Sequence, residues 1–139
     1  MEEPRWLLRE EVDVIHWDLI EEHGGAHGIG DEGAIESALA RPRQKWAYQE
    51  GIDLSALAAA YSYGLTTNHG YVDGNKRVAF VSLVLFLRRN GLWLRAAQDE
   101  VVRVMEELAA GERDEDDLVG WVREHVQRRT DPGGGGRSL

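Results

Sequence analysis

The chain has 139 residues, a length that suits one domain with a single hydrophobic core and leaves no room for two. Its 25 acidic and 16 basic residues give a net charge of −9, so most of the surface repels nucleic acid and direct DNA or RNA binding is not expected. There is no cysteine, which excludes disulfide bonds and thiolate metal sites.

The first predicted helix covers residues 10–23, where Val12, Ile15 and Leu19 recur at helical spacing before Gly24-Gly25 ends the pattern. His16 lies on the same inward face. A histidine in that position is usually a hydrogen-bonded core residue, so we assign it no catalytic role.

Asp31 is a suitable N-cap for a second helix over residues 32–40, which Pro42 should end because its ring disfavours helical geometry in the preceding residue. Residues 41–51 show no helical period, so an exposed loop or short hairpin is expected there. Asp53 then caps a third helix that leads directly to His69.

Residues 75–89 are apolar on nearly every side, which is typical of a helix buried among others, and Asn90-Gly91 ends the run. A buried strand is the alternative, but the length of the run favours a helix. Two more helices are predicted, over residues 98–110 and 114–128. The tail, residues 130–139, contains four consecutive glycines and is expected to be disordered.

The predicted fold is therefore an all-α, single-domain bundle of about six helices over residues 1–129, with a short flap or hairpin loop. The longest apolar run, residues 78–87, is well short of the roughly 20 residues that a membrane span needs. The N-terminus has neither the basic start nor the apolar core of a signal peptide. These features predict a soluble, cytoplasmic protein.

The polar loop over residues 69–77 runs directly into the buried helix and carries the chemistry of the chain. A helix N-terminus offers free backbone N–H groups and a positive dipole end, and Gly74 lets backbone approach a ligand closely. Lys76 and Arg77 place two positive charges there, which favours a bound anion such as phosphate.

Two further side chains of this loop suit phosphoryl transfer. Asp73 supplies one hard oxygen ligand, which fits Mg²⁺ because that ion takes one or two carboxylates and completes its shell with water and phosphate. His69 can accept a proton from a hydroxyl nucleophile near neutral pH. A base, a magnesium ligand and a phosphate cradle are the parts that phosphoryl or nucleotidyl transfer needs. For any one of these residues alone, a purely structural role is the commoner outcome.

The segment His69-Gly-Tyr-Val-Asp-Gly-Asn-Lys-Arg77 resembles the signature of the Fic/Doc family. That signature has a histidine, an aromatic residue two positions later, an acid two further on, then Gly or Ala, Asn, and Gly-Arg or Lys-Arg. The Lys76-Arg77 ending is similar to the Doc branch, and Phe80 stands where the nucleotidyl-transferring proteins carry a second arginine. The resemblance extends to Ile15-His16, residues 23–25, 28–31 and 35–42, and Asn90-Gly91.

The resemblance implies a role for each residue of the loop. His69 would be the general base, Asp73 the magnesium ligand, and Gly74, Asn75, Lys76 and Arg77 the contacts to the ATP phosphates. Residues 41–51 would correspond to the flap that positions the target chain.

The family also implies a function: a toxin kinase that moves the γ-phosphate of ATP to a threonine of elongation factor Tu and so inhibits translation. Inhibition would come from a separate antitoxin that folds on the toxin as a helix, since no Ser or Thr of this chain precedes a Glu at the spacing of an internal inhibitory motif. Nucleotidyl transfer to a protein hydroxyl and a non-catalytic binding module remain alternatives, because these residues alone do not fix how the nucleotide lies.

Gly70 and Tyr71 depart from the proline and phenylalanine that are usual in the family. Gly70 is expected to loosen the loop, whereas Tyr71 keeps a ring that packs beneath it. The expected result is tuned rather than lost activity.

Overall fold

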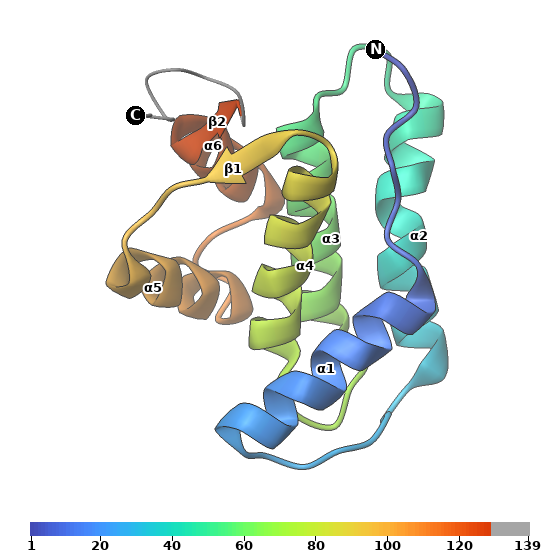
Figure 1. The fold of residues 1–139 in the computed structure, drawn as a ribbon, viewed down its shortest axis with the longest axis vertical. Coiled ribbons are helices and arrows are strands. Elements are labelled where there is room, and N and C mark those ends of the chain that lie inside the picture. The colour runs from blue at the N-terminus through green and yellow to red at the C-terminus, as the bar shows by residue number, and fades with distance from the viewer. Residues whose placement is uncertain (129–139) are drawn as a thin grey trace.

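The computed structural model describes residues 1–128, which form six helices and one pair of short strands. The all-α class expected from the sequence is confirmed (Figure 1). The predicted tail, residues 130–139, lies outside the described residues. In chain order the elements are α1 (Arg9–His23), α2 (Glu32–Tyr48), α3 (Leu54–Asn68), α4 (Asn75–Arg89), β1 (Leu92–Leu94), α5 (Gln98–Ala109), α6 (Glu115–His125) and β2 (Val126–Arg128).

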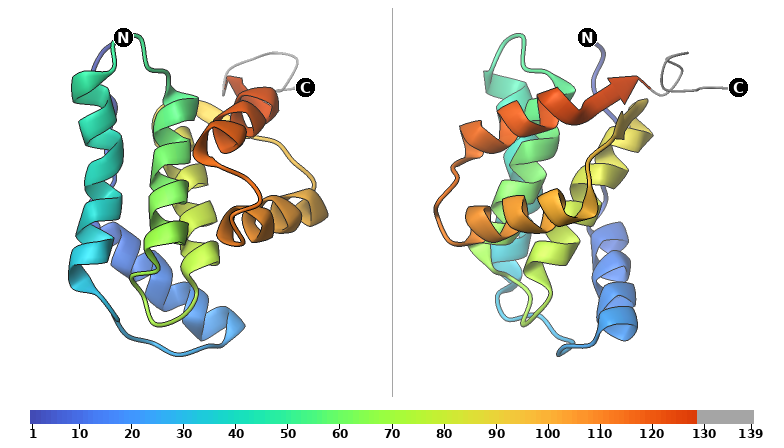
Figure 2. Two further views of the ribbon diagram at one scale, coloured as in Figure 1. Left: turned by 180° about the vertical axis from the view of Figure 1, so that it is seen from behind. Right: turned by 90° about the vertical axis from the view of Figure 1, so that its left-hand side faces the viewer.

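An antiparallel pair, α3 and α4, forms the centre of the molecule (Figure 1). Helix α2 packs against one side of α3, and α5 and α6 cover the opposite side of the pair, as the two views in Figure 2 also show. Helix α1 crosses the end of the bundle at which α3 stops and α4 begins. The connection between α3 and α4, which holds the polar loop, therefore lies next to α1.

Helix α3 is central because its sequence allows close approach on several sides. Asp53 caps it by accepting a hydrogen bond from the Ala56 N–H at 2.9 Å, as the sequence predicts. Its three alanines at residues 58–60 are fully buried, and a Cβ added at Gly64 would lie 3.1 Å from the Cα of Ala38 on α2. Small residues on α3 thus let α2 pack directly against its backbone.

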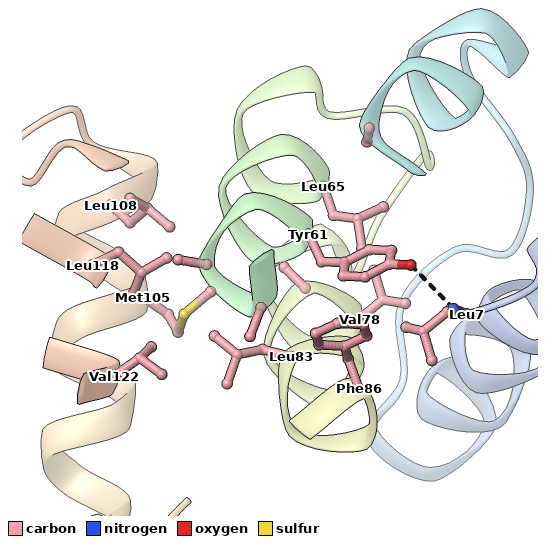
Figure 3. Close-up of a cluster of buried hydrophobic side chains, with 14 of the residues drawn as sticks. Leu7, Tyr61, Leu65, Val78, Leu83, Phe86, Met105, Leu108, Leu118 and Val122 are labelled. Carbon is pink, nitrogen blue, oxygen red and sulfur yellow. Dashed lines mark hydrogen bonds between the residues drawn. The ribbon is translucent and has the colours of Figure 1, made fainter. Parts of the chain in front are cut away.

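Large side chains from α3, α4, α5 and α6 fill the space between the helices (Figure 3). Tyr61 and Phe86 are fully buried, with ring centroids 5.1 Å apart. The Tyr61 hydroxyl accepts a hydrogen bond from the backbone N–H of Leu7 at 3.0 Å, so the one polar atom of this ring is satisfied (Figure 3).

The segment before α1 is held against the far end of α4. Arg89 donates to both carboxylate oxygens of Glu11 at 2.7 and 2.6 Å and to the carbonyl oxygen of Trp6 at 3.2 Å. Asn90 exchanges hydrogen bonds with the backbone of Arg5. Leu7 is 2% exposed, so the N-terminal segment is part of the core.

The loop or hairpin predicted over residues 41–51 is wrong, because α2 continues to Tyr48 with Pro42 inside it. Proline removes one backbone hydrogen bond and costs about 3 kcal/mol in a helix interior. Pro42 is buried, and the turns after it make tertiary contacts that offset this cost. Trp46 packs edge-on against Trp6 at 6.5 Å, and Lys45 forms an ion pair with Glu115 at 3.3 Å. The non-helical connection to α3 is reduced to residues 49–53.

Two features near the C-terminal side were not expected from the sequence. β1 and β2 pair antiparallel, with Leu92 opposite Arg128 and Leu94 opposite Val126, and they tie α4 to the end of α6. In addition, α6 ends at His125, before the predicted limit of residue 128. Within residues 1–128 no helix has both the length and the apolar character needed to cross a membrane.

Candidate active site

His69 is the C-cap of α3 and the only non-glycine residue with a positive φ among the described residues, with φ 52° and ψ 50°. A left-handed conformation costs a β-carbon-bearing residue about 1–2 kcal/mol, so the surrounding structure must hold it. The ring is exposed and makes no hydrogen bond or ion pair within residues 1–128. The backbone of His69 is therefore fixed at a helix end while its imidazole stays available to a ligand.

Gly70 anchors the loop rather than loosening it, which corrects the expectation from the sequence. Its carbonyl oxygen accepts hydrogen bonds from the N–H groups of Gly30 and Asp31, both at 2.9 Å. A Cβ at this position would lie 2.5 Å from Cγ1 of Ile35 and 3.0 Å from the backbone nitrogen of the same residue. Only glycine allows this close packing against the start of α2.

Tyr71 packs beneath the loop, as predicted, and is 2% exposed. Its ring stacks on His16 of α1, with centroids 3.9 Å apart and planes at 12°. Its hydroxyl donates to Oδ1 of Asp13 at 2.5 Å. Burial, followed by this bond to a carboxylate, raises the pKa of Tyr71, so the hydroxyl remains a donor well above neutral pH.

Asn75, predicted as a phosphate contact, uses its side chain to hold the loop. The side-chain oxygen accepts from the Tyr71 N–H at 3.0 Å, and the amide nitrogen donates to the Tyr71 carbonyl at 2.9 Å. Both interactions are buried. The backbone N–H of Asn75, at the first position of α4, remains free for an anion.

Asp73 is exposed, and backbone donors fix its carboxylate. Oδ2 accepts from the Ala26 N–H at 3.2 Å, and Oδ1 accepts from the Gly74 N–H at 2.9 Å. These two bonds, helped by the charge of Arg77, hold the pKa of Asp73 below its ordinary value. Because each oxygen has accepted only one hydrogen bond, lone pairs remain for a cation.

His16 is 4% exposed and hydrogen-bonded, which confirms its reading as a satisfied core histidine. Its Nε2 lies 2.7 Å from the carbonyl oxygen of Asp73 and donates to it. Together with the stack on Tyr71, this bond gives His16 a positioning role for the loop that the sequence did not reveal. Asp13 was missed for the same reason, since both contacts join α1 to residues more than 50 positions away.

The N-terminus of α4 gathers free backbone donors and positive side chains. Gly74, in the left-handed region at φ 77°, is the N-cap, and a Cβ there would lie 3.1 Å from Cδ1 of Ile20. The backbone N–H groups of Asn75, Lys76 and Arg77 have no acceptor within residues 1–128. The side chains of Lys76 and Arg77 are exposed and form no ion pair with the described residues. Three free donors and two uncompensated cations thus converge at one helix end.

These groups line a cleft of about 1090 Å³, large enough for a nucleotide, since ligand pockets commonly measure about 300–1000 Å³. Its polar end contains the predicted site residues. Its other end lies between α4 and α5 and is mainly apolar, with Arg88, Gln98 and Glu106 also among the lining residues. The polar end is lined by His69, Asp73, Gly74, Asn75, Lys76 and Arg77, and the apolar end by Phe80, Val84, Leu94, Val101, Met105 and Leu108.

The residues present fit a magnesium ion of the kind the sequence predicts. Asp73 offers an ionised, accessible carboxylate beside the free N-terminus of α4. Within residues 1–128 no three His, Cys, Asp or Glu side chains gather as a ligand cluster, so Mg²⁺ would take this one carboxylate and complete its shell with water and phosphate oxygens.

Comparison with known proteins agrees with this geometry. Residues 6–87 match the model of the Fic/DOC family. "Protein kinase doc" of Escherichia phage P1 is 38% identical over 88 residues, which is 63% of this chain and 70% of that protein. "Toxin Doc" of Mycolicibacterium smegmatis (strain ATCC 700084 / mc(2)155) is 37% identical over 102 residues, 69% of this chain and 76% of that protein. The matched region contains α1 to α3, the whole polar loop and α4 up to Leu87. The chain therefore belongs to the Fic/DOC family, in the branch of the proteins named Doc.

Proposed function

We propose that the chain is the toxin of a type II toxin–antitoxin system and acts as a protein kinase. It transfers the γ-phosphate of ATP to a Thr or Ser hydroxyl of a translation factor, elongation factor Tu by family resemblance, and so inhibits translation. The observation that carries the proposal is that the exposed, unpartnered His69 lines the same cleft as the free N-terminus of α4. The names of the two relatives, a kinase and a toxin, support the same reading.

Each residue of the loop has a separate role in the proposed reaction. The N–H groups of residues 75–77 and the side chains of Lys76 and Arg77 hold the phosphates and balance the charge that develops on them. Asp73 would hold Mg²⁺, which when bound neutralises phosphate charge and orients the γ-phosphate.

His69 accepts the proton of the acceptor hydroxyl as that oxygen bonds to the γ-phosphorus. The bond from the γ-phosphorus to the β–γ bridging oxygen breaks at the same time, and ADP leaves with that electron pair. The proton on His69 then passes to solvent. The loop supplies position and charge, which is most of what phosphoryl transfer requires.

Nucleotidyl transfer is the alternative reaction, with the same base directing the hydroxyl at the α-phosphorus of a nucleotide that lies the other way round. Lys76 and Phe80 favour the kinase, because the chain has no cation at position 80 and that ring instead lines the apolar part of the cleft. A module that only binds a partner is the second alternative. The proposal includes control by an antitoxin that binds as a helix, and a cytoplasmic location, where ATP and translation factors occur.

The test is transfer of label to purified elongation factor Tu in the presence of Mg²⁺, with ATP labelled at the γ- or the α-phosphate in parallel reactions. We expect label from the γ-position only, lowered about 10²–10⁴-fold by His69→Ala and lost in Asp73→Ala. His23→Ala is the matched control, because His23 is an exposed histidine that lines the same cleft but lies on α1, outside the loop.

Label from the α-position would replace the kinase with a nucleotidyl transferase that uses the same residues. If no label reached the factor and His69→Ala left growth inhibition intact, the binding-module alternative would take the place of both.

A further inference from the structure

Thr66 has a buried hydroxyl that the fold does not use. The residue lies in the last turn of α3 and is 5% exposed, and its Oγ1 has no hydrogen-bond partner within residues 1–128. Most buried polar side chains are paired, and leaving a hydroxyl unpaired costs a fold about 1–3 kcal/mol. Such a group at a functional cleft calls for an explanation by a ligand.

Its neighbours on α3 show what a satisfied hydroxyl looks like here. Thr67 donates to the carbonyl oxygen of Tyr63 at 2.7 Å, the usual bond of a helical threonine to the preceding turn. Ser62, one turn before Thr66, donates to the sulfur of Met105 at 3.8 Å. The Thr66 hydroxyl makes neither kind of contact, and Thr66 is one of the residues that line the cleft of the proposed active site.

The position of Thr66 within that cleft selects the part of the ligand it meets. Helices α3 and α4 are antiparallel and joined by residues 69–74, so the last turn of α3 lies beside the first turn of α4 (Figure 1). Thr66 precedes His69 by one helical turn, on the same side of α3. Thr66 therefore lies near the end of the cleft that contains His69 and the N-terminus of α4.

We propose that the Thr66 hydroxyl donates a hydrogen bond to the phosphate chain of the nucleotide bound in the cleft, and is thus a further binding residue of this site. The inference rests on the proposed use of ATP and extends it beyond the signature loop, to α3. A phosphate oxygen is a charged acceptor, and a hydrogen bond to a charged acceptor is stronger than one to a neutral acceptor.

The experiment measures binding of ATP with Mg²⁺ and, separately, of inorganic triphosphate with Mg²⁺, by titration calorimetry on the full chain. Thr66→Val removes the hydroxyl and keeps the shape. We expect both Kd values to rise about tenfold or more, the effect of losing one hydrogen bond to a charged group. Thr66→Ser keeps the hydroxyl and should stay within about threefold of the wild-type values.

Ser82 provides a matched control within the chain. Its hydroxyl is likewise fully buried and unpartnered among the described residues, but it does not line the cleft. Ser82→Ala should leave both Kd values unchanged. Thermal unfolding separates folding from binding, because Thr66→Val should melt at or above the wild-type temperature once an unpaired hydroxyl is gone. If the valine variant is unstable, Thr66→Ala replaces it in the titrations.

Each result decides the proposal. Wild-type affinity in Thr66→Val overturns it, as does an equal loss in Thr66→Ser, which would mean that shape and not the hydroxyl matters. Weaker ATP binding with unchanged triphosphate binding would also overturn it, by moving the contact to the nucleoside. If the wild-type chain bound neither probe, both the proposed function and the inference would be wrong. If Thr66→Val kept wild-type affinity and transferred label from the γ-phosphate, only the inference would be wrong.

Discussion

Replacing Tyr71 by phenylalanine isolates a single hydrogen bond between the signature loop and α1. The ring can keep its stack on His16, and only the bond from the hydroxyl to Asp13 at 2.5 Å disappears. A hydrogen bond to a charged acceptor contributes about 1.5–3 kcal/mol to stability. The Asp13 side chain is 39% exposed, so water replaces part of what is lost. We therefore expect a loss of about 1–2 kcal/mol, or roughly 3–7 °C in Tm for a chain of this length.

The assay is thermal unfolding followed by circular dichroism, with urea unfolding as a second measure of the free energy. Tyr48→Phe is the control, since Tyr48 is 86% exposed and its hydroxyl has no partner within residues 1–128. The reasoning would be refuted if Tyr71→Phe melted with the control. The raised pKa of Tyr71 adds a pH signature, because its contribution is present below the ordinary tyrosine value near 10 and is lost as pH rises through the folded value.

Three other outcomes follow from contacts described above. The hydrogen bond from Arg89 is the main cause that lowers the pKa of Glu11 to about 2. The ionised carboxylate therefore stabilises the fold above about pH 4.5, and this contribution is lost as pH falls toward 2. Urea unfolding of Glu11→Gln should show a smaller loss of stability over that acid range. Gly70→Ala should cost about 1–3 kcal/mol through overlap with Ile35, and unchanged stability would contradict the anchoring role given to this glycine. Gly25→Ala places a Cβ 2.7 Å from Oδ2 of Asp73. The rate of label transfer should therefore fall more than the free energy of unfolding does. If thermal unfolding showed a loss of stability as large as the loss of transfer, the effect would not be local to Asp73.

Where local signals agree, the sequence predicts the fold well. Helix α4 was expected over residues 75–89 and has those bounds, because an apolar run, a glycine before it and Asn90-Gly91 after it all point the same way. Helix α2 was cut short at Pro42 because the rule for proline describes an isolated helix. It does not include the contacts that Trp46 and Lys45 make with distant segments. The strands β1 and β2 are only three residues each and lie on either side of two helices, so no hairpin pattern marks them.

The residues of the candidate site could be grouped from the sequence because they are contiguous. His69, Asp73, Lys76 and Arg77 all line one cleft, as expected from a loop that enters a helix. The contacts that support the loop could not be predicted from the sequence. The contact of His16 with Asp73 spans 57 positions, and a sequence pattern shows that a residue faces inward but not which residue it faces. The bonds that the Asn75 side chain makes with the Tyr71 backbone were not predicted for the same reason, since they depend on how the chain turns at Tyr71.

The attachment of the N-terminal segment to α4 has a consequence during synthesis. Glu11 is synthesised 78 residues before its partner, Arg89 of α4. At roughly 5–20 residues per second, the ribosome adds that partner about 4–16 s after Glu11. Until then α1 has no docking site at the far end of α4. The start of α1 can thus dock on α4 only after the signature loop, residues 69–77, has been synthesised.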